Sequence, residues 1–122
     1  MGDKPYRACV VGVILNKHGC VLCGKRRDNG AWQLPQGGVD PGETVKTALY
    51  REMQEETGCQ ELKIIGEFPE FLRYDFPVEL VKPIAKRYRG QEQKWFLCEL
   101  GERGELEVAS FQAGDEFLEL KW

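Results

Sequence analysis

The chain has 122 residues, of which 42% are hydrophobic and 30% are charged, a composition typical of one globular domain spanning 1–122. Its net charge of −3 argues against binding nucleic acid through bulk positive charge, although a local basic patch stays open. No apolar run approaches the roughly 20 residues that a membrane-spanning helix needs, and the N-terminus lacks the apolar core of a signal peptide. We therefore expect a cytoplasmic protein with no membrane contact.

Apolar runs and turn residues divide the chain into strands around one main helix. A run rich in Val and Ile predicts a buried strand over 7–15, and a turn then leads into the second strand of a hairpin over 20–27. A helix is expected over 44–57, where no Pro or Gly occurs. Further strands are expected over 61–68, 70–74, 91–100 and 117–122, an irregular or briefly helical segment over 78–89, and an acidic loop over 101–107. This order of strands, helix and strands indicates an α+β fold.

The expected helix carries carboxylates where its apolar stripe should continue. Glu52, Glu55 and Glu56 extend the face that Ala48 and Leu49 begin. Like charges at this spacing each destabilise an exposed helix by roughly 0.2–0.5 kcal/mol, and the last helical turns favour cations. One interpretation is a solvated acidic face, but such a face should lie opposite the apolar stripe. The other is a site for a hard divalent cation such as Mg²⁺ or Mn²⁺, which would remove the repulsion.

The segment 37–59 resembles the Nudix box, whose pattern is G-x5-E-x7-R-E-U-x-E-E-x-G-U with U a bulky apolar residue. The matching positions are Gly37, Glu43, Arg51, Glu52, Met53, Glu55, Glu56, Gly58 and, less closely, Cys59. Because so many positions match in one loop and helix, the chain is identified as a member of the Nudix hydrolase family. The resemblance implies an α/β/α sandwich with a mixed sheet, in which the box forms a loop-helix-loop at the sheet edge.

Segments outside the box resemble one branch of this family. The chain carries WQLPQGG at 32–38, FLRYDFP at 71–77 and YRGQEQKWF at 88–96, and it opens with the pair Tyr6-Arg7. The branch comprises the bacterial and plant-type asymmetric diadenosine tetraphosphate hydrolases and the bacterial RNA 5′-pyrophosphohydrolases. The implied reaction splits a phosphoanhydride bond in a dinucleoside polyphosphate or at a 5′-triphosphorylated RNA end.

The resemblance also implies a metal site in the box. The implied ligands of Mg²⁺, with Mn²⁺ as a substitute, are the Gly37 carbonyl and the carboxylates of Glu52, Glu55 and Glu56. Arg51 and Glu43 are implied to support these ligands without touching substrate. A general base is also needed, and the alternatives are Glu116, which would otherwise be an additional metal ligand, and Glu55.

Cations are needed to bind the phosphates of such a substrate, and the basic segment 82–94 supplies several of them. The resemblance implies that Lys94 contacts phosphate. Further candidates for phosphate or base contacts are Arg7, Arg27, Tyr74 and Lys86. A solvated loop remains the alternative for the basic segment, and Tyr74 is equally a candidate for a core aromatic residue.

The chain departs from the branch at several positions. Leu118 and Leu120 replace an Asp and a Trp that the branch places after Glu116, and Cys9 stands where relatives carry Asn. The family's C-terminal helix is expected to be missing after Trp122, which would expose sheet surface. Two other functions stay open: a non-catalytic nucleotide- or RNA-binding module, and a hydrolase of another nucleotide such as an oxidised dNTP or a sugar nucleotide. The oligomeric state is not predicted.

Overall fold

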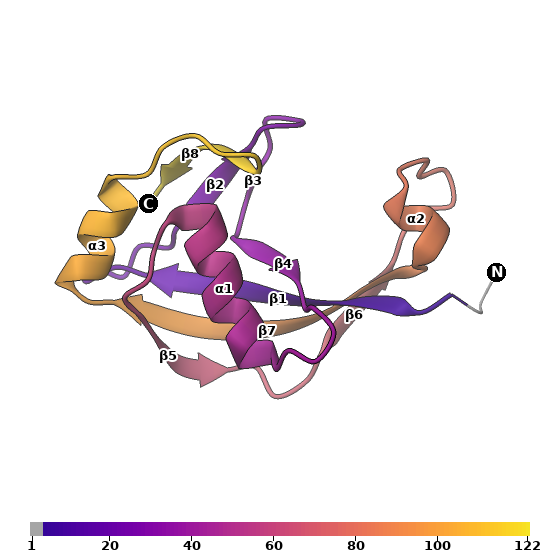
Figure 1. Ribbon diagram of the computed structural model, residues 1–122, viewed down its shortest axis with the longest axis horizontal. Coiled ribbons are helices and arrows are strands. Elements are labelled where there is room, and N and C mark those ends of the chain that lie inside the picture. Colours follow the sequence, from indigo (N-terminus) through magenta and orange to yellow (C-terminus); the bar gives the residue numbers. More distant parts are fainter. Residues whose placement is uncertain (1–3) are drawn as a thin grey trace.

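The computed structural model describes residues 4–122 as two β-sheets and three helices (Figure 1). The strands are β1 (Tyr6–Leu15), β2 (Cys23–Arg26), β3 (Trp32–Gln33), β4 (Gln36–Gly38), β5 (Leu62–Glu67), β6 (Leu72–Asp75), β7 (Gly90–Leu100) and β8 (Phe117–Lys121). The helices are α1 (Val45–Thr57), α2 (Ile84–Arg87) and α3 (Glu102–Ala109). No helix in this part of the chain is long and apolar enough to cross a membrane.

The larger sheet is mixed, as the sequence predicts. Its strand order is β4-β1-β7-β5, and β6 pairs with the other end of β7. β1 and β7 run parallel over their whole length, whereas β4, β5 and β6 pair antiparallel with their neighbours. A smaller sheet has the order β3-β2-β8. The predicted α+β class with a mixed sheet is therefore confirmed.

The hairpin expected between 7–15 and 20–27 forms only next to its turn. The antiparallel bridge Leu15–Val21 joins the two segments there, together with hydrogen bonds from the Asn16 amide to Cys20 and from the Leu22 amide to Ile14. Further along, β2 pairs with β3 and β8 instead. The buried ring of Phe117 explains this choice of partner, since it packs so closely on Gly24 that a side chain there would collide with it. Contacts between distant segments therefore decide where the second strand goes.

The boundaries of α1 follow local signals in the sequence. The Thr44 side chain accepts a hydrogen bond from the Thr47 amide at 3.1 Å and caps the first turn. Gly58 ends the helix in the left-handed conformation, with φ 77°, which glycine adopts without strain. The predicted helix over 44–57 is confirmed, with Thr44 as the cap rather than the first helical residue.

The hydrophobic core lies between α1 and one face of the larger sheet. Leu49 and Met53 are fully buried against β1 and β7, where Ile14 and Phe96 belong to the same core cluster. Met53 lies so close to Gly12 of β1 that a side chain there would collide with it. This close approach presses α1 onto the sheet and fixes which face of the helix points inward.

The acidic loop expected over 101–107 is wrong, because this segment forms most of α3. Glutamates in its first turn suit the positive end of the helix dipole. Gly104 lies against the Glu61 carbonyl, and Glu107 accepts hydrogen bonds from the Gln60 and Glu61 amides, each at 2.9 Å. Val108 is buried in the core. Gly104 allows the helix to approach the chain after α1.

The segment over 78–89 is briefly helical, as predicted. α2 and the residues on either side of it form a lobe, defined here as residues 76–89, which stands apart from α1 in Figure 1. Hydrogen bonds from the Arg89 amide to the Pro5 carbonyl and from the Phe76 amide to the Arg89 carbonyl close the base of this lobe. The α2 lobe therefore faces the rest of the molecule across open space.

Candidate active site

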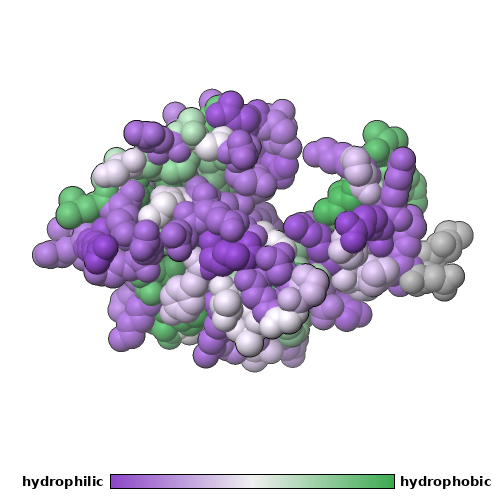
Figure 2. Space-filling model, viewed as in Figure 1, coloured by the Kyte–Doolittle hydropathy of each residue, from purple (hydrophilic) through white to green (hydrophobic). Residues whose placement is uncertain are grey.

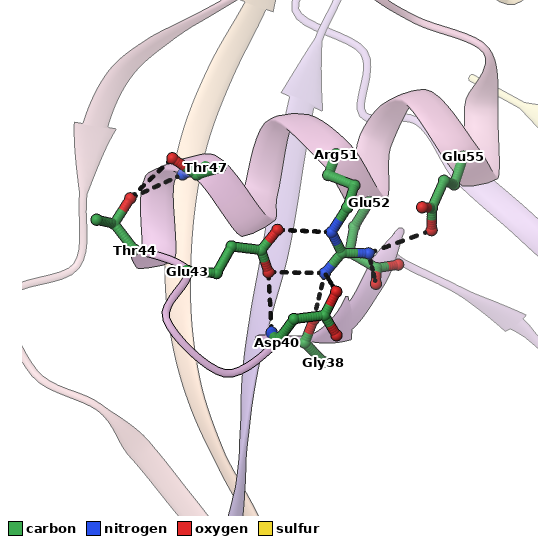
Figure 3. Close-up of polar contacts among 8 residues, drawn as sticks. All are labelled: Gly38, Asp40, Glu43, Thr44, Thr47, Arg51, Glu52 and Glu55. Atoms are coloured by element: carbon green, nitrogen blue, oxygen red, sulfur yellow. Dashed lines mark hydrogen bonds and ion pairs between the residues drawn. The ribbon is translucent and has the colours of Figure 1, made fainter.

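Arg51, on the polar side of α1, organises the loop that precedes the helix (Figure 3). Its guanidinium binds both carboxylate oxygens of Glu43, with Nε–Oε2 at 2.7 Å and Nη2–Oε1 at 2.9 Å, and Nη2 also donates to the Gly38 carbonyl at 2.8 Å. The other terminal nitrogen, Nη1, donates to Glu52 at 2.8 Å and to Glu55 at 3.3 Å. One side chain therefore joins the loop to two of the expected metal ligands.

Glu43 is fixed from two directions. Besides its paired contacts with Arg51, it accepts a hydrogen bond from the Asp40 amide at 2.9 Å. The Arg51 guanidinium first, and then the Asp40 amide, lower the pKa of Glu43 to about 2. Glu43 is thus an anion at neutral pH whose charge is used to orient Arg51, in agreement with the supporting role that the resemblance implies.

Glu52 lies directly over the backbone of β4. A Cβ at Gly37 would overlap the Glu52 carboxylate, so Glu52 could keep this position only if residue 37 has no side chain. Only 13% of the Glu52 side chain is exposed, and this burial raises its pKa despite the contact with Arg51. The first residue of the box and its first helical carboxylate are therefore in direct contact.

Glu56 is a buried carboxyl group that is held by a backbone amide. It accepts a hydrogen bond from the Gln36 amide at 2.9 Å and is 7% exposed. Burial first, and then the nearby charges of Glu116, Glu52 and Glu55, raise its pKa to about 8. The structure thus gathers three carboxylates around Glu56, with Arg26 also near enough to interact with its charge.

The chemistry of these groups fits a divalent cation, although they do not form a ready-made cluster. Among residues 4–122, no group of three or more metal-ligating side chains is arranged to hold an ion, because Arg51 draws Glu52 and Glu55 to itself. The donors are nevertheless all hard oxygens, which Mg²⁺ and Mn²⁺ prefer. The raised pKa of Glu56 is a second argument for a cation site, because a cation would offset the burial and the repulsion that raise this pKa.

These carboxylates border a cavity of about 790 Å³ between the body of the molecule and the α2 lobe. Figure 2 shows the hollow, with hydrophilic residues on both sides of it. The acidic residues that line it are Glu52, Glu55, Glu56, Asp115 and Glu116, and the basic and aromatic ones are Arg7, Arg26, Lys82, Tyr74 and Phe76. We call these carboxylates the acidic wall, and the cations with the aromatic rings the basic wall. The two adjoin, since Arg26 lies within reach of the charges of Glu56 and Glu116, and together they suit a nucleotide with its phosphates.

The structure brings several predicted site residues to this cavity. Arg7, Tyr74 and Glu116 line it, together with the box carboxylates. Cys9, which replaces the asparagine of relatives, also lines it but is almost completely buried. Tyr74 is 46% exposed and donates a hydrogen bond to Gln91 at 2.9 Å, so it is a wall residue rather than a core aromatic.

Other predicted contacts lie elsewhere. Arg27 is not part of the cavity lining, and it donates to the carbonyl of Gly114, a lining residue, at 2.8 Å. Lys94 is buried at 7% exposure, and its ammonium group donates to the Phe68 carbonyl at 2.7 Å. Lys86 is exposed on α2 and is not part of the cavity lining.

Arg26 and Lys82 line the cavity, and neither was singled out as a contact from the sequence. The run Lys25-Arg26-Arg27 was the available signal. A register shift between Lys25 and Arg26 interrupts the alternation of β2, so spacing alone could not tell which arginine points inward. For Lys82, the signal was the basic segment of the α2 lobe.

The chain belongs to the Nudix family, because the NUDIX domain model matches residues 5–122. Curated relatives include the RNA pyrophosphohydrolase of Roseobacter denitrificans, which is 45% identical over 97% of this chain and 76% of the relative. The RNA pyrophosphohydrolase of Erythrobacter litoralis is 42% identical over 98% of this chain and 77% of the relative. Similar solved structures include the MutT protein of Methanosarcina mazei Go1, with a TM-score of 0.65, 25% identity and coverage of 98% and 78%. The Ap4A hydrolase of C. elegans has a TM-score of 0.64, 25% identity and coverage of 96% and 79%.

Proposed function

We propose that this chain is a Mg²⁺-dependent pyrophosphohydrolase that cleaves a phosphoanhydride bond in a nucleoside 5′-polyphosphate. The substrate class is a 5′-triphosphorylated RNA end or a dinucleoside polyphosphate such as diadenosine tetraphosphate. The observation that carries this proposal is the cavity in which the box carboxylates face Arg7, Arg26 and Lys82. The names of the relatives support it, since RNA pyrophosphohydrolases match nearly the whole chain at 40–45% identity. The cytoplasm, where both substrates occur, is the proposed compartment.

The acidic wall would hold the metal through groups already described. The proposed ligands are the Gly37 carbonyl and the carboxylates of Glu52, Glu55, Glu56 and Glu116. When bound there, Mg²⁺, or Mn²⁺ in its place, supplies neutralisation of phosphate charge and acidification of a water molecule. Arg51 and Glu43 keep two of these carboxylates in position, which is a role that affects metal affinity rather than substrate contact.

The basic wall would position the phosphate chain for attack. Arg26 and Arg7 offer guanidinium groups, which bind phosphate oxygens in pairs, and Lys82 offers a point charge. Tyr74 and Phe76 lie edge to face, with ring centroids 6.1 Å apart, and offer an aromatic surface for a base. Catalysis by such a site depends mainly on positioning and on electrostatic stabilisation of the phosphate charge.

A carboxylate must accept the proton that the attacking water loses. Water forms the new bond to phosphorus, the bridging phosphoanhydride oxygen leaves with the departing phosphate, and the proton passes to the base. Glu116 and Glu55 are the candidates, since both line the cavity beside Glu56. Glu55 is the more exposed, with 58% of its side chain accessible, and can move from Arg51 towards the cavity.

The test is incubation with Mg²⁺ and a panel of substrates, with products resolved by chromatography. The panel contains 5′-triphosphorylated RNA, diadenosine tetraphosphate, 8-oxo-dGTP and ADP-ribose, each with and without a chelator. We expect chelator-sensitive cleavage of one or both of the first two. Turnover of only the last two would support a hydrolase of another nucleotide, and binding without any turnover would support a non-catalytic module.

A further inference from the structure

Asp28, in the turn between β2 and β3, joins a cation of the body to a cation of the α2 lobe. Its Oδ1 atom accepts a hydrogen bond from Arg26 Nε at 2.8 Å, and its Oδ2 atom accepts one from Arg26 Nη2. The same Oδ2 atom lies 3.7 Å from Lys82 Nζ. Arg26 belongs to the body and Lys82 to the α2 lobe, and both line the cavity, whereas Asp28 does not. One carboxylate thus links the body to the α2 lobe.

The contacts of Asp28 occupy the groups that a phosphate would use. A guanidinium has five N–H donors, of which Asp28 takes two on Arg26 and the Gln33 side chain takes one at 3.2 Å. A carboxylate held by two parallel N–H bonds resembles a bound phosphate in both charge and geometry. The cations that face the cavity are therefore partly neutralised from behind by a group of the protein itself.

Asp28 has the charge and the accessibility that a displaceable anion needs. The hydrogen bonds from Arg26, and more weakly the charge of Lys82, lower the pKa of Asp28, so it is ionised at neutral pH. About half of its side chain is exposed, as is more than half of the Lys82 side chain. Because exposed ion pairs contribute little to folding, these contacts can open without disturbing the core.

We propose that Asp28 is an internal counter-anion that competes with the substrate's phosphates for Arg26 and Lys82 and so weakens substrate binding. The inference rests on the proposed function, since those phosphates belong to the proposed substrate. Displacing Asp28 carries the same cost in the ground state and the transition state, because the phosphate chain contacts the basic wall in both. Asp28 therefore raises KM and leaves kcat unchanged.

The test compares the wild type with Asp28→Asn, which keeps the shape of the side chain and removes its charge. Inorganic tripolyphosphate is titrated into each protein by calorimetry at low ionic strength with a chelator present, so that no turnover occurs. We expect the Asp28→Asn dissociation constant to be about two- to fivefold lower, in line with the strength of exposed ion pairs. The difference should shrink at high salt, where exposed charges are screened.

Glu92→Gln provides a matched control. Glu92 is paired with Arg73 at 3.3 Å, and it follows Gln91, which lines the cavity. Adjacent strand residues point to opposite faces, so Glu92 points away from the cavity while its substitution changes the net charge by the same amount. We expect tripolyphosphate to bind Glu92→Gln as it binds the wild type.

Lys82→Gln completes a cycle with Asp28→Asn. Loss of Lys82 should weaken binding more in the Asp28→Asn background than in the wild type, because Lys82 is then no longer neutralised. Steady-state kinetics with Mg²⁺ should show a lower KM and an unchanged kcat for Asp28→Asn. Thermal unfolding of each variant checks that the fold is kept.

Several results would overturn the proposal. Weaker tripolyphosphate binding by Asp28→Asn would mean that Asp28 instead orients Arg26 for the anion. If Asp28→Asn binds tripolyphosphate as Glu92→Gln does, or if the wild type does not bind it, no competition occurs at Asp28. If the calorimetry gives the expected result but no substrate is turned over, the proposed function fails and the counter-anion role stands.

Discussion

At the scale of single residues, the Nudix box contains one carboxylate that is well matched by its neighbours and one that is not. Glu43 lies between the Arg51 guanidinium and the Asp40 amide, and its pKa falls to about 2. Glu56 is buried among other acids, and its pKa rises to about 8. Burial of Glu56 among other acids therefore makes the fold less stable at the position where a cation is expected, and such perturbed groups are common at functional sites.

Without metal, Glu56 should make the protein less stable as the pH rises. Its pKa is 4.5 as the ordinary value and about 8 in the folded chain, so the folded state keeps a proton that the unfolded state has lost. The free energy of unfolding should then fall between pH 4.5 and pH 8, and Glu56→Gln should remove that slope. Denaturant unfolding at several pH values, with a chelator present, measures this, and equal slopes in both proteins would contradict it.

Glu43 should produce the opposite dependence on pH. Its pKa is lowered, so its stabilising effect is present above the ordinary value of 4.5 and is lost as the pH falls towards about 2. We expect the wild type to lose stability over this range more steeply than Glu43→Gln. The same unfolding series, extended to acid, measures the difference, and parallel curves would show that the contact with Arg51 does not contribute.

Arg51→Lys should weaken metal binding although the charge is kept. Lysine has no planar fork, so it cannot hold Glu43, Gly38 and Glu52 together as the guanidinium does. Loss of such a supporting contact typically lowers metal affinity by about 10- to 100-fold. Calorimetric titration with Mn²⁺ measures it, and Arg103→Lys is the matched control because Arg103 is exposed on α3. Equal Mn²⁺ affinity in both variants would contradict the supporting role of Arg51.

Residue roles were predictable where the box fixes them and not where distant segments meet. Glu52, Glu56 and Arg51 lie together because they share one helix. Arg27 was expected at the cavity and Arg26 is found there, because the register shift in β2 interrupts the alternation that the prediction needed. That bulge forms through pairing with β8, which lies nearly a hundred residues further along the chain. The local sequence around β2 therefore does not predict it.

At the scale of elements, local signals fix the ends of α1. Tertiary contacts instead determine that α3 is a helix and which strands β2 pairs with. Thr44 and Gly58 mark the helix by their own chemistry. Most of α3 was expected to be an acidic loop over 101–107. The structure shows that Gly104 is needed for contact with the Glu61 backbone, which a single sequence does not reveal.

Gly104→Ala should destabilise the protein, although alanine favours helix formation. A Cβ at this position would collide with the Glu61 carbonyl and meet the Leu100 side chain at 3.2 Å. Overpacking of this kind typically costs about 1–3 kcal/mol. Chemical denaturation measures it, and Gly114→Ala is the control, because a Cβ there meets nothing within 4 Å. Unchanged or higher stability of Gly104→Ala would mean that α3 does not depend on this close approach.

At the scale of the whole molecule, the cavity combines residues of one continuous segment with residues that are far apart in the sequence. The acidic wall comes from one continuous segment, 37–59, with Glu116 added from the turn before β8. The basic wall comes from β1, β2 and the α2 lobe, which are far apart in the sequence and belong to the larger sheet, the smaller sheet and neither sheet, respectively. The expected metal ligands of the site can thus be predicted from one motif, whereas the position of the groups proposed to bind the substrate depends on the complete fold.

The measurement that tests the central claim most directly is hydrolysis of 5′-triphosphorylated RNA in Mg²⁺ by three proteins: the wild type, Glu55→Gln and Glu102→Gln. Glu102 is an exposed glutamate at the start of α3 and serves as the control. We expect cleavage by the wild type and Glu102→Gln that a chelator abolishes, and a loss of about 100-fold or more in Glu55→Gln. Full activity of Glu55→Gln, or cleavage that a chelator does not affect, would contradict the assignment of metal-dependent hydrolysis to this cavity.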